Sequence, residues 1–203
     1  MKYDYEVVGR KVAYQRHFRV EELRLRHRRF GGGWSEVLDR ELIDRGDAAA
    51  VVPYDPVRDE LVMIEQFRTG AMRPGESAWI YEFIAGLIGE HEQPAEVAVR
   101  EAREEANLDV HDLVPIGAFY LSPGGSTEKL HLFCGRADTR AAGGVFGLAS
   151  EGEDIRAHVL PREDAERMLE DGSNLPAWTA LALQWLMINR RKLIAQWGLP
   201  GAS

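Results

Sequence analysis

The sequence predicts an α/β or α+β fold built on a mixed sheet, rather than a doubly wound parallel sheet. Short apolar runs separated by turn residues indicate many strands, several of them paired as hairpins. Only three segments have the spacing of helices, which is too few to alternate with the strands as βαβ units require. The length of 203 residues fits one globular domain with a small appended subdomain.

The composition is that of an ordinary soluble globular protein. Hydrophobic residues make up 45% and charged residues 29%, and no apolar run reaches the roughly 20 residues of a membrane span. The N-terminus lacks the apolar segment of a secretory signal. Cys134 is the one cysteine, which excludes an internal disulfide and fits a reducing cytoplasm, where we expect the protein. The net charge of −8 argues against a nucleic-acid partner, and no membrane partner is expected.

Residues 1–46 are expected to form a small antiparallel β subdomain. Four short stretches have the composition of strands, and a glycine-rich turn at 30–34 precedes the last of them. So small a sheet is not stable alone, so we expect it to pack on the rest of the chain or on a second subunit. The expected strands lie at 6–8, 11–14, 18–25 and 36–43.

Residues 47–203 are expected to form the main domain. An apolar strand at 48–54, a turn at 55–59 and a return strand at 60–68 indicate a hairpin at its start. A helix begins at Pro94, where the missing N–H and fixed φ of proline cost nothing. The other expected elements are strands at 78–84, 115–121, 130–135 and 155–160, a glycine-rich loop at 136–153, and helices at 162–170 and 176–197.

The helix after Pro94 carries a dense run of carboxylates. Its buried face is expected to consist of small apolar residues at spacings of three and four, namely Ala95, Ala98, Val99, Ala102 and Ala106. Glu101 and Glu105 lie one turn apart, so their charges destabilise the helix unless something neutralises them. A hard divalent cation takes such oxygen ligands. From the charge pattern alone, a solvated helix face is the commoner explanation.

The residues before this helix favour a metal site over a solvated helix face. In GLIGEHEQPAEVAVREAREEANL, residues 86–108, Gly86 is followed after five residues by Glu92 and after seven more by Arg100-Glu101-Ala102, with Glu104-Glu105 one residue further on. This spacing resembles the Nudix box, the signature of hydrolases that cut nucleoside diphosphates linked to another group. Asn107 departs from the box, which has glycine there. That glycine is interpreted as a left-handed helix cap, for which asparagine is the usual second choice, so Asn107 should be tolerated.

Other segments resemble the ADP-ribose pyrophosphatase branch of this family. They are the loop FYLSPGGSTE at 119–128, the hairpin sequence at 48–68, Arg40-Glu41, and GLASEGEDI at 147–155. The resemblance implies a Nudix α/β/α sandwich for the second domain. It also implies a homodimer of the bacterial type, in which the N-terminal subdomains are exchanged and contribute to the adenine site.

The resemblance also implies the residues of the metal site. Glu101, Glu105 and Glu153, with the carbonyl of Ala85, would hold two or three Mg²⁺ ions, for which Mn²⁺ could substitute. Glu151 would be the catalytic base that activates water, although its position alone suits an acidic loop residue that aids solubility. Whether Glu104 is itself a ligand is left open.

For the substrate, the resemblance implies a pyrophosphate clamp and an adenine pocket. Arg68 would hold phosphate oxygens, for which a guanidinium is well shaped, and an aromatic ring would stack on the base. The branch commonly has an aromatic residue where this chain has His17, so the stacking partner is open. The implied substrate-binding residues are His17, Phe18, Arg40, Glu41, Arg45, Arg68, Leu87, Ser122, Pro123, Gly124 and Glu128.

Together these features predict Mg²⁺-dependent hydrolysis of ADP-ribose to AMP and ribose 5-phosphate. One alternative is a hydrolase of another nucleoside diphosphate sugar, such as GDP-mannose, which would use the same groups. A second alternative, of a different class, is a non-catalytic sensor that binds ADP-ribose. A sensor would be expected to lack carboxylates of the box, and all of them are present.

Overall fold

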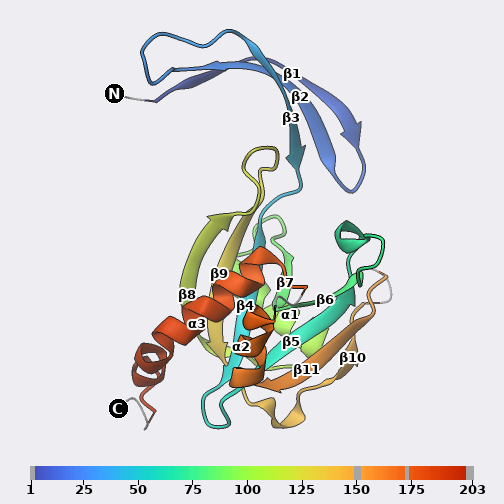
Figure 1. Ribbon diagram of the computed structural model, residues 1–203, viewed down its shortest axis with the longest axis vertical. Coiled ribbons are helices and arrows are strands. Elements are labelled where there is room, and N and C mark those ends of the chain that lie inside the picture. The colour runs from blue at the N-terminus through green and yellow to red at the C-terminus, as the bar shows by residue number, and fades with distance from the viewer. Residues whose placement is uncertain (1–2, 149–151, 172–173, 200–203) are drawn as a thin grey trace. The chain divides into compact units, whose positions relative to one another are not determined.

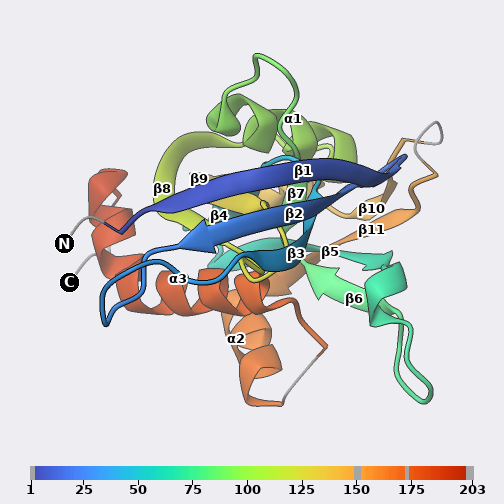
Figure 2. The same cartoon turned by 90° about the horizontal axis from the view of Figure 1, so that it is seen from above.

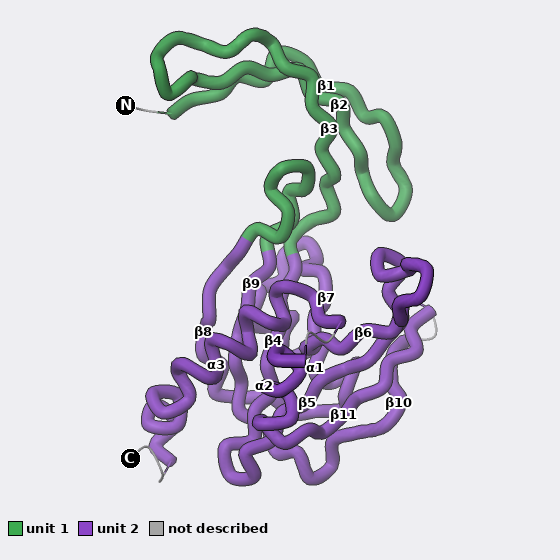
Figure 3. The backbone as a smooth tube through the Cα atoms, in the orientation of Figure 1, with its two compact units in different colours: residues 1–47, 120–129 green, residues 48–119, 130–203 purple. Residues whose placement is uncertain are grey.

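The computed structural model describes residues 3–148, 152–171 and 174–199. The chain divides into two compact units, drawn in green and purple in Figure 3. The first comprises Met1–Asp47 and Tyr120–Lys129, and the second comprises Ala48–Phe119 and Leu130–Ser203. The boundary after residue 46 that the sequence predicted would instead place residues 120–129 in the second domain. The roles expected of the N-terminal domain, in dimerisation and adenine binding, stay predictions.

The first unit is built on an antiparallel sheet with the strand order β1-β2-β3 (Figure 1). Leu23, on the central strand, is the one buried apolar side chain among the residues described in this unit. Several large apolar side chains of β1 are instead exposed, including Tyr5, Val8 and Tyr14. The strands are β1 (Tyr5–Gln15), β2 (Arg19–His27) and β3 (Leu38–Asp44).

Strand β1 replaces two shorter strands expected from the sequence. Its pairing with β2 continues across two register shifts, one between Val7 and Gly9 and one between Val12 and Tyr14. A bulge inserts an extra residue into one strand and so shifts the alternation of its side chains. The sequence pattern is therefore interrupted near residues 9 and 13, although the ladder is not.

Hydrogen bonds to β3 explain why the segment Tyr120–Lys129 belongs to the first unit. The Ile43 N–H donates to the Gly125 carbonyl at 2.8 Å, and the Thr127 N–H donates to the Ile43 carbonyl at 3.0 Å. The Thr127 hydroxyl adds a bond of 3.0 Å to the carboxylate of Asp44. The loop with the SPGG sequence is thus attached to the N-terminal sheet through its own backbone.

The second unit is built on a mixed sheet. Its strand order is β10-β11-β5-β4-β9-β8, with β6 paired to β5 and β7 paired to β4. The β4–β9 pair is parallel, whereas β5 is antiparallel to β4, β6 and β11, which confirms the predicted mixed sheet. The strands are β4 (Ala48–Asp55), β5 (Glu60–Phe67), β6 (Trp79–Glu82), β7 (Ile84–Leu87), β8 (His111–Tyr120), β9 (Lys129–Arg136), β10 (Gly144–Phe146) and β11 (Ile155–Pro161).

The single strand expected at 78–84 is two strands, β6 and β7. Glu82 pairs with Ile64 of β5, whereas Ile84 pairs with Val51 of β4. The chain therefore changes partner strand at Phe83, which is itself buried. A continuous apolar run in the sequence does not reveal such a change, because both halves have the composition of a strand.

Helices cover both faces of this sheet, as Figures 1 and 2 show. One core cluster joins Val51 and Ile64 to α1, and the other joins Val52 and Met63 to α2 and α3. The predicted α/β/α sandwich is therefore confirmed. None of the helices in the described part of the chain is both long and apolar enough to cross a membrane. The helices are α1 (Pro94–Ala106), α2 (Arg162–Glu170) and α3 (Ala177–Gln196).

Candidate active site

Helix α1 packs closely on the sheet because its buried face is made of small residues. Ala98, Ala102 and Ala106 are completely buried, as predicted. The face is rotated from the predicted one, because Val97 and Glu105 are buried on it whereas Ala95 and Val99 are only half-buried. This rotation carries a carboxylate into the interior of the unit. The close approach of α1 therefore sets the position of the acidic residues.

Glu105 lies against the backbone of β7. Its side chain is almost wholly buried, with 3% of the residue exposed, and the Ala85 N–H donates to Oε2 at 3.3 Å. Glu101, one turn earlier, lies over Gly86, where the Cβ of any other residue would overlap the Glu101 carboxylate. The first glycine of the motif is thus required by the close approach of β7 and the Glu101 side chain.

Arg100 holds three neighbouring carboxylates of the motif. Its guanidinium donates to Glu92 at 3.0 Å, to Glu101 at 2.8 Å and to Glu104 at 2.9 Å. Glu92 also accepts a bond of 2.7 Å from the Gly89 N–H, which fixes the turn before the helix. Glu104 is therefore occupied by Arg100, whereas Glu105 has no such cationic partner at bonding distance among the described residues.

The electrostatic environment makes the Glu105 charge unfavourable. Burial raises the pKa of Glu105 well above its usual value, and the nearby charges of Glu101 and Glu153 raise it further. The pKa of Glu101 is also raised, first by burial and then by Glu104 and Glu153, although Arg100 opposes the shift. Carboxylates that repel one another in a desolvated place are stabilised by a cation between them.

Glu153 reaches this region from the loop before β11. Its side chain accepts a hydrogen bond of 3.0 Å from the Leu148 N–H, and its own N–H donates to the Leu148 carbonyl at 3.3 Å. Gly147 has a φ of +105°, and a Cβ there would approach the Glu153 Cβ to 2.7 Å. The expected base, Glu151, lies outside the described residues.

The donor set fits a hard divalent cation. Carboxylate oxygens with a backbone carbonyl are the ligands that Mg²⁺ and Ca²⁺ prefer. Across the described ranges of the chain, no three acidic, histidine or cysteine side chains already converge in a metal-binding cluster. Glu101, Glu105 and Glu153 are thus electrostatic neighbours whose repulsion a cation would relieve, rather than a preformed cage.

The structure brings four of the predicted substrate-binding residues together within the first unit. The His17 and Phe18 rings are in edge contact with their centroids 4.8 Å apart, and the Arg45 guanidinium lies 5.6 Å from the Phe18 centroid. Arg45 also pairs with Glu128 at 3.6 Å. An aromatic ring beside a cation and a carboxylate can bind a planar base by stacking and by hydrogen bonds.

The other predicted substrate residues are spread over β3, β7 and the SPGG loop. Arg40 and Glu41 are exposed neighbours on β3, so their side chains point to opposite faces of that sheet. Ser122 accepts backbone bonds of 3.1 Å from Gly125 and 2.9 Å from Ser126, which form the loop's turn around Pro123 and Gly124. Leu87 is exposed at the end of β7.

One polar residue near the site was missed by the sequence analysis. Glu82, in the apolar segment WIYEF, is 4% exposed and accepts a hydrogen bond from Arg68 Nε at 2.5 Å. A lone carboxylate within an apolar strand was the available signal. The position of Arg68, just past the end of β5, agrees with the predicted strand end.

Comparison with known proteins gives the family. The NUDIX domain family model matches residues 44–180, more than half of the chain. The chain therefore belongs to the Nudix family. This agrees with the box at Gly86–Glu105 and with the placement of α1 against β7.

Individual relatives show which members of the family this chain resembles. The chain is 43% identical over 196 residues to the ADP-ribose pyrophosphatase of Escherichia coli strain K12, covering 97% of this chain and 94% of the relative. It is 39% identical to the ADP-ribose pyrophosphatase of Haemophilus influenzae, with coverages of 96% and 91%. The GDP-mannose pyrophosphatase of Pectobacterium atrosepticum is 31% identical, with coverages of 90% and 94%.

A solved structure supports the fold. The crystal structure of an ADP compounds hydrolase superposes with a TM-score of 0.69 at 23% identity, and the match covers 96% of each chain. The similarity thus extends over both units, each with its own sheet.

Asn107 provides a test of the helix cap. Its φ of 48° and ψ of 42° are left-handed, and its N–H bonds to the carbonyls of Ala102 and Arg103, as the cap interpretation predicted. We expect Asn107→Gly to leave the free energy of unfolding unchanged or slightly raised, and Asn107→Ala to lower it by about 1 kcal/mol. Urea unfolding measures both. An alanine variant as stable as the glycine variant would contradict this account.

Proposed function

We infer that this protein is a divalent-metal-dependent ADP-ribose pyrophosphatase. Its metal would be Mg²⁺, and its location would be the cytoplasm. The observation that carries the inference is the complete acidic set around buried Glu105, in a chain aligned over 97% of its length with a relative of that name. A relative named GDP-mannose pyrophosphatase is more distant, at 31% identity. ADP-ribose is therefore favoured over GDP-mannose as substrate.

Glu101, Glu105 and Glu153, with the Ala85 carbonyl, would hold the cations. The buried position of Glu105 and its repulsion by Glu101 and Glu153 support this assignment. Two or three Mg²⁺ ions, replaceable by Mn²⁺, would neutralise the pyrophosphate and lower the pKa of a bound water. Glu104, which Arg100 already engages, supports the site by holding Arg100 in place.

The remaining chemistry belongs to side chains of the protein. Glu151 takes the proton of the attacking water. The water oxygen bonds to one phosphorus as the bridging P–O bond of the anhydride breaks, so one water and one ADP-ribose give AMP and ribose 5-phosphate. Arg68 donates hydrogen bonds to phosphate oxygens, whose charge it stabilises as the bond breaks.

The first unit would supply the adenine end of the site. The contact of Arg45 with Phe18 and Glu128 supports a base-binding role, which His17, Arg40 and Glu41 complete. Ser122, Pro123, Gly124 and the backbone near Leu87 would line the rest of the substrate. The exposed apolar side chains of β1 support a homodimer in which the N-terminal units are exchanged, so that part of each adenine site comes from the partner subunit.

A substrate panel tests the function. ADP-ribose, GDP-mannose, NADH and diadenosine polyphosphates are each incubated with the protein and Mg²⁺, and the products are separated by anion-exchange chromatography. We expect the highest kcat/KM with ADP-ribose and equal amounts of AMP and ribose 5-phosphate. A higher kcat/KM for GDP-mannose would overturn the substrate assignment. Tight binding of ADP-ribose with no release of AMP would instead identify a sensor.

A further inference from the structure

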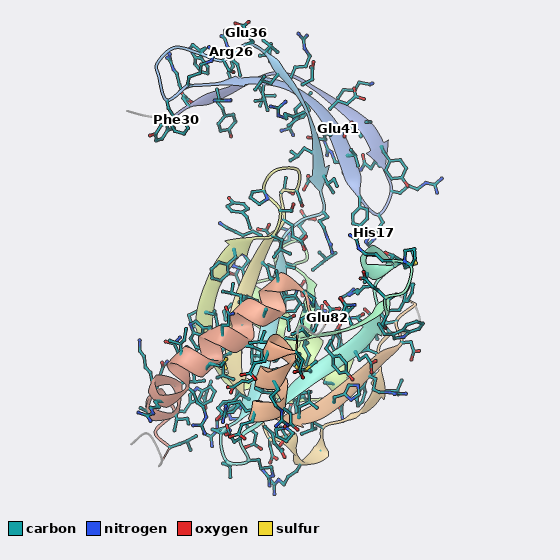
Figure 4. The ribbon with its side chains drawn as sticks, viewed as in Figure 1. His17, Arg26, Phe30, Glu36, Glu41 and Glu82 are labelled. Atoms are coloured by element: carbon teal, nitrogen blue, oxygen red, sulfur yellow. The ribbon has the colours of Figure 1, made fainter. Side chains whose placement is uncertain are left out.

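The β5–β6 hairpin places a buried carboxylate beside the arginine assigned to the pyrophosphate. Glu82 lies opposite Ile64 in the ladder, and the Arg68 N–H extends the pairing by donating to the Ala78 carbonyl at 2.8 Å. Because side chains alternate along a strand, Ile64, Gln66 and Arg68 share one face of the sheet. Ile64 belongs to the core cluster of α1, so this is the face that carries Glu105. Figure 4 labels Glu82 on this hairpin.

Only one edge of the Arg68 guanidinium is engaged. Nε donates to Glu82 Oε1 at 2.5 Å, and neither terminal nitrogen is hydrogen-bonded to a residue that the structure describes. The Arg68 side chain is 44% exposed, whereas that of Glu82 is 5% exposed. A guanidinium presents five N–H groups in one plane, so the two terminal nitrogens stay available for an oxyanion.

Arg68 also acts on the acidic site. Its positive charge favours the ionised form of Glu105, although the larger effects of burial and of Glu101 raise the pKa of that carboxyl. Burial likewise raises the pKa of Glu82, and Arg68 opposes that shift. Two buried carboxylates thus attract Arg68, namely Glu82 in the hairpin and Glu105 on α1. Its direct bond is to Glu82.

Stability alone does not explain a charged pair at this position. Removing the Glu82 carboxylate from water costs several kcal/mol, and an apolar residue of similar volume often stabilises a core as well or better. Gln66 is 7% exposed, and its side-chain amide lowers the pKa of Glu82. Burial still raises the pKa of Glu82 overall, so its polar neighbours offset the cost of burying this carboxylate only in part.

We propose that Glu82 is a positioning residue: by holding Arg68 Nε, it directs the two terminal nitrogens to the pyrophosphate and keeps the guanidinium away from Glu105. This rests on the proposed function, which gives Arg68 its phosphate. Without the Glu82 charge, Arg68 is still attracted by Glu105, which lies on the same face of the sheet. Arg68 would then compete with the divalent cation for Glu105.

The first test is Glu82→Gln, which keeps the shape of the side chain and removes its charge. We expect kcat/KM for ADP-ribose to fall roughly tenfold to a hundredfold, as for loss of a hydrogen bond between charged groups. The matched control is Glu65→Gln, on the opposite face of the same hairpin, where the carboxylate pairs with His158 at 2.9 Å. This control should leave kcat/KM unchanged.

A double-mutant cycle separates positioning from a structural role. In an Arg68→Ala background, Glu82→Gln should cause no further loss of kcat/KM, because its effect acts through Arg68. A loss of the same factor in both backgrounds would overturn the proposal, and so would an unchanged kcat/KM in Glu82→Gln. Circular dichroism checks the fold of each variant. Should Glu82→Gln not fold, Glu82→Asp, which keeps the charge but shortens the reach, takes its place in the same cycle.

Binding of Mn²⁺ to the substrate-free protein gives a readout independent of turnover. We expect the Mn²⁺ affinity, measured by calorimetric titration, to fall in Glu82→Gln and to recover in Glu82→Gln/Arg68→Ala. An affinity that stays low after removal of Arg68 would contradict the competition between Arg68 and the cation. This measurement needs no ADP-ribose, so a failure of the proposed substrate in the panel remains distinguishable from a failure of the positioning role.

Discussion

Glu105→Gln is expected to reduce kcat for ADP-ribose by a factor of roughly 10²–10³ or more, while the protein stays folded. Glu105 is buried, and its carboxylate lies beside the charges of Glu101 and Glu153. Glutamine keeps the volume and can still accept the Ala85 N–H, but it lacks the charge that a divalent cation requires. Initial rates at saturating Mg²⁺ and ADP-ribose measure the loss.

The same substitution is expected to stabilise the metal-free protein. The pKa of Glu105 is raised in the folded state, so folding is opposed at any pH where this buried carboxyl must be ionised. The metal-free parent should therefore gain stability as the pH falls through the raised pKa of Glu105 toward the unfolded pKa of about 4.3, because protonation removes the buried charge. Glu105→Gln should lack this component of the pH dependence.

Thermal unfolding in EDTA measures the effect. At a pH above the raised pKa of Glu105, relief of an uncompensated buried charge should raise the free energy of unfolding by about 1–3 kcal/mol, and each kcal/mol shifts Tm by roughly 2–4 °C in a protein of this size. Mg²⁺ should raise the Tm of the parent and not that of the variant. Glu90→Gln is the control, because its carboxylate is exposed in the same segment. A metal-free Glu105→Gln less stable than the parent at this pH would refute the account.

The local structure around the predicted acidic site was largely predictable because its signal is local. The fixed spacing from Gly86 to Glu105 lies within one strand, one turn and one helix, and each has its own sequence signal. The left-handed cap at Asn107 was predicted for the same reason. The exact buried face of α1 was not, since it depends on how the helix rolls on the sheet. Val97 and Glu105 are buried there, rather than Ala95 and Val99.

Features that depend on strand pairing were not predictable from the sequence. The bond between Glu82 and Arg68, fourteen residues earlier in the chain, could be recognised only once β6 was paired to β5. The attachment of the SPGG loop to the N-terminal sheet likewise depends on backbone hydrogen bonds between Ile43 and residues more than eighty positions away. Local patterns specify that a strand forms, and pairing decides which side chains meet.

Glu151→Gln is expected to lower kcat by roughly 10²–10⁴, the usual contribution of a general base, while leaving the binding of divalent cations intact. The distinction from Glu105→Gln is that Glu151 is assigned to the proton of water and not to the cation. Calorimetric titration with Mn²⁺ should therefore give the affinity of the parent for Glu151→Gln and a weakened affinity for Glu105→Gln.

The pH dependence provides a second signature of the base. Without a group to accept the proton, hydrolysis by Glu151→Gln should accelerate steadily as hydroxide replaces water as the nucleophile, so the variant should recover part of its activity at alkaline pH. Glu163→Gln, an exposed carboxylate at the start of α2, is the control and should keep the profile of the parent. If Glu151→Gln retains near-parental kcat at neutral pH, the proton must leave through another group. Glu153, the assigned metal ligand two positions further along the chain, could not serve both as base and as a fully engaged ligand.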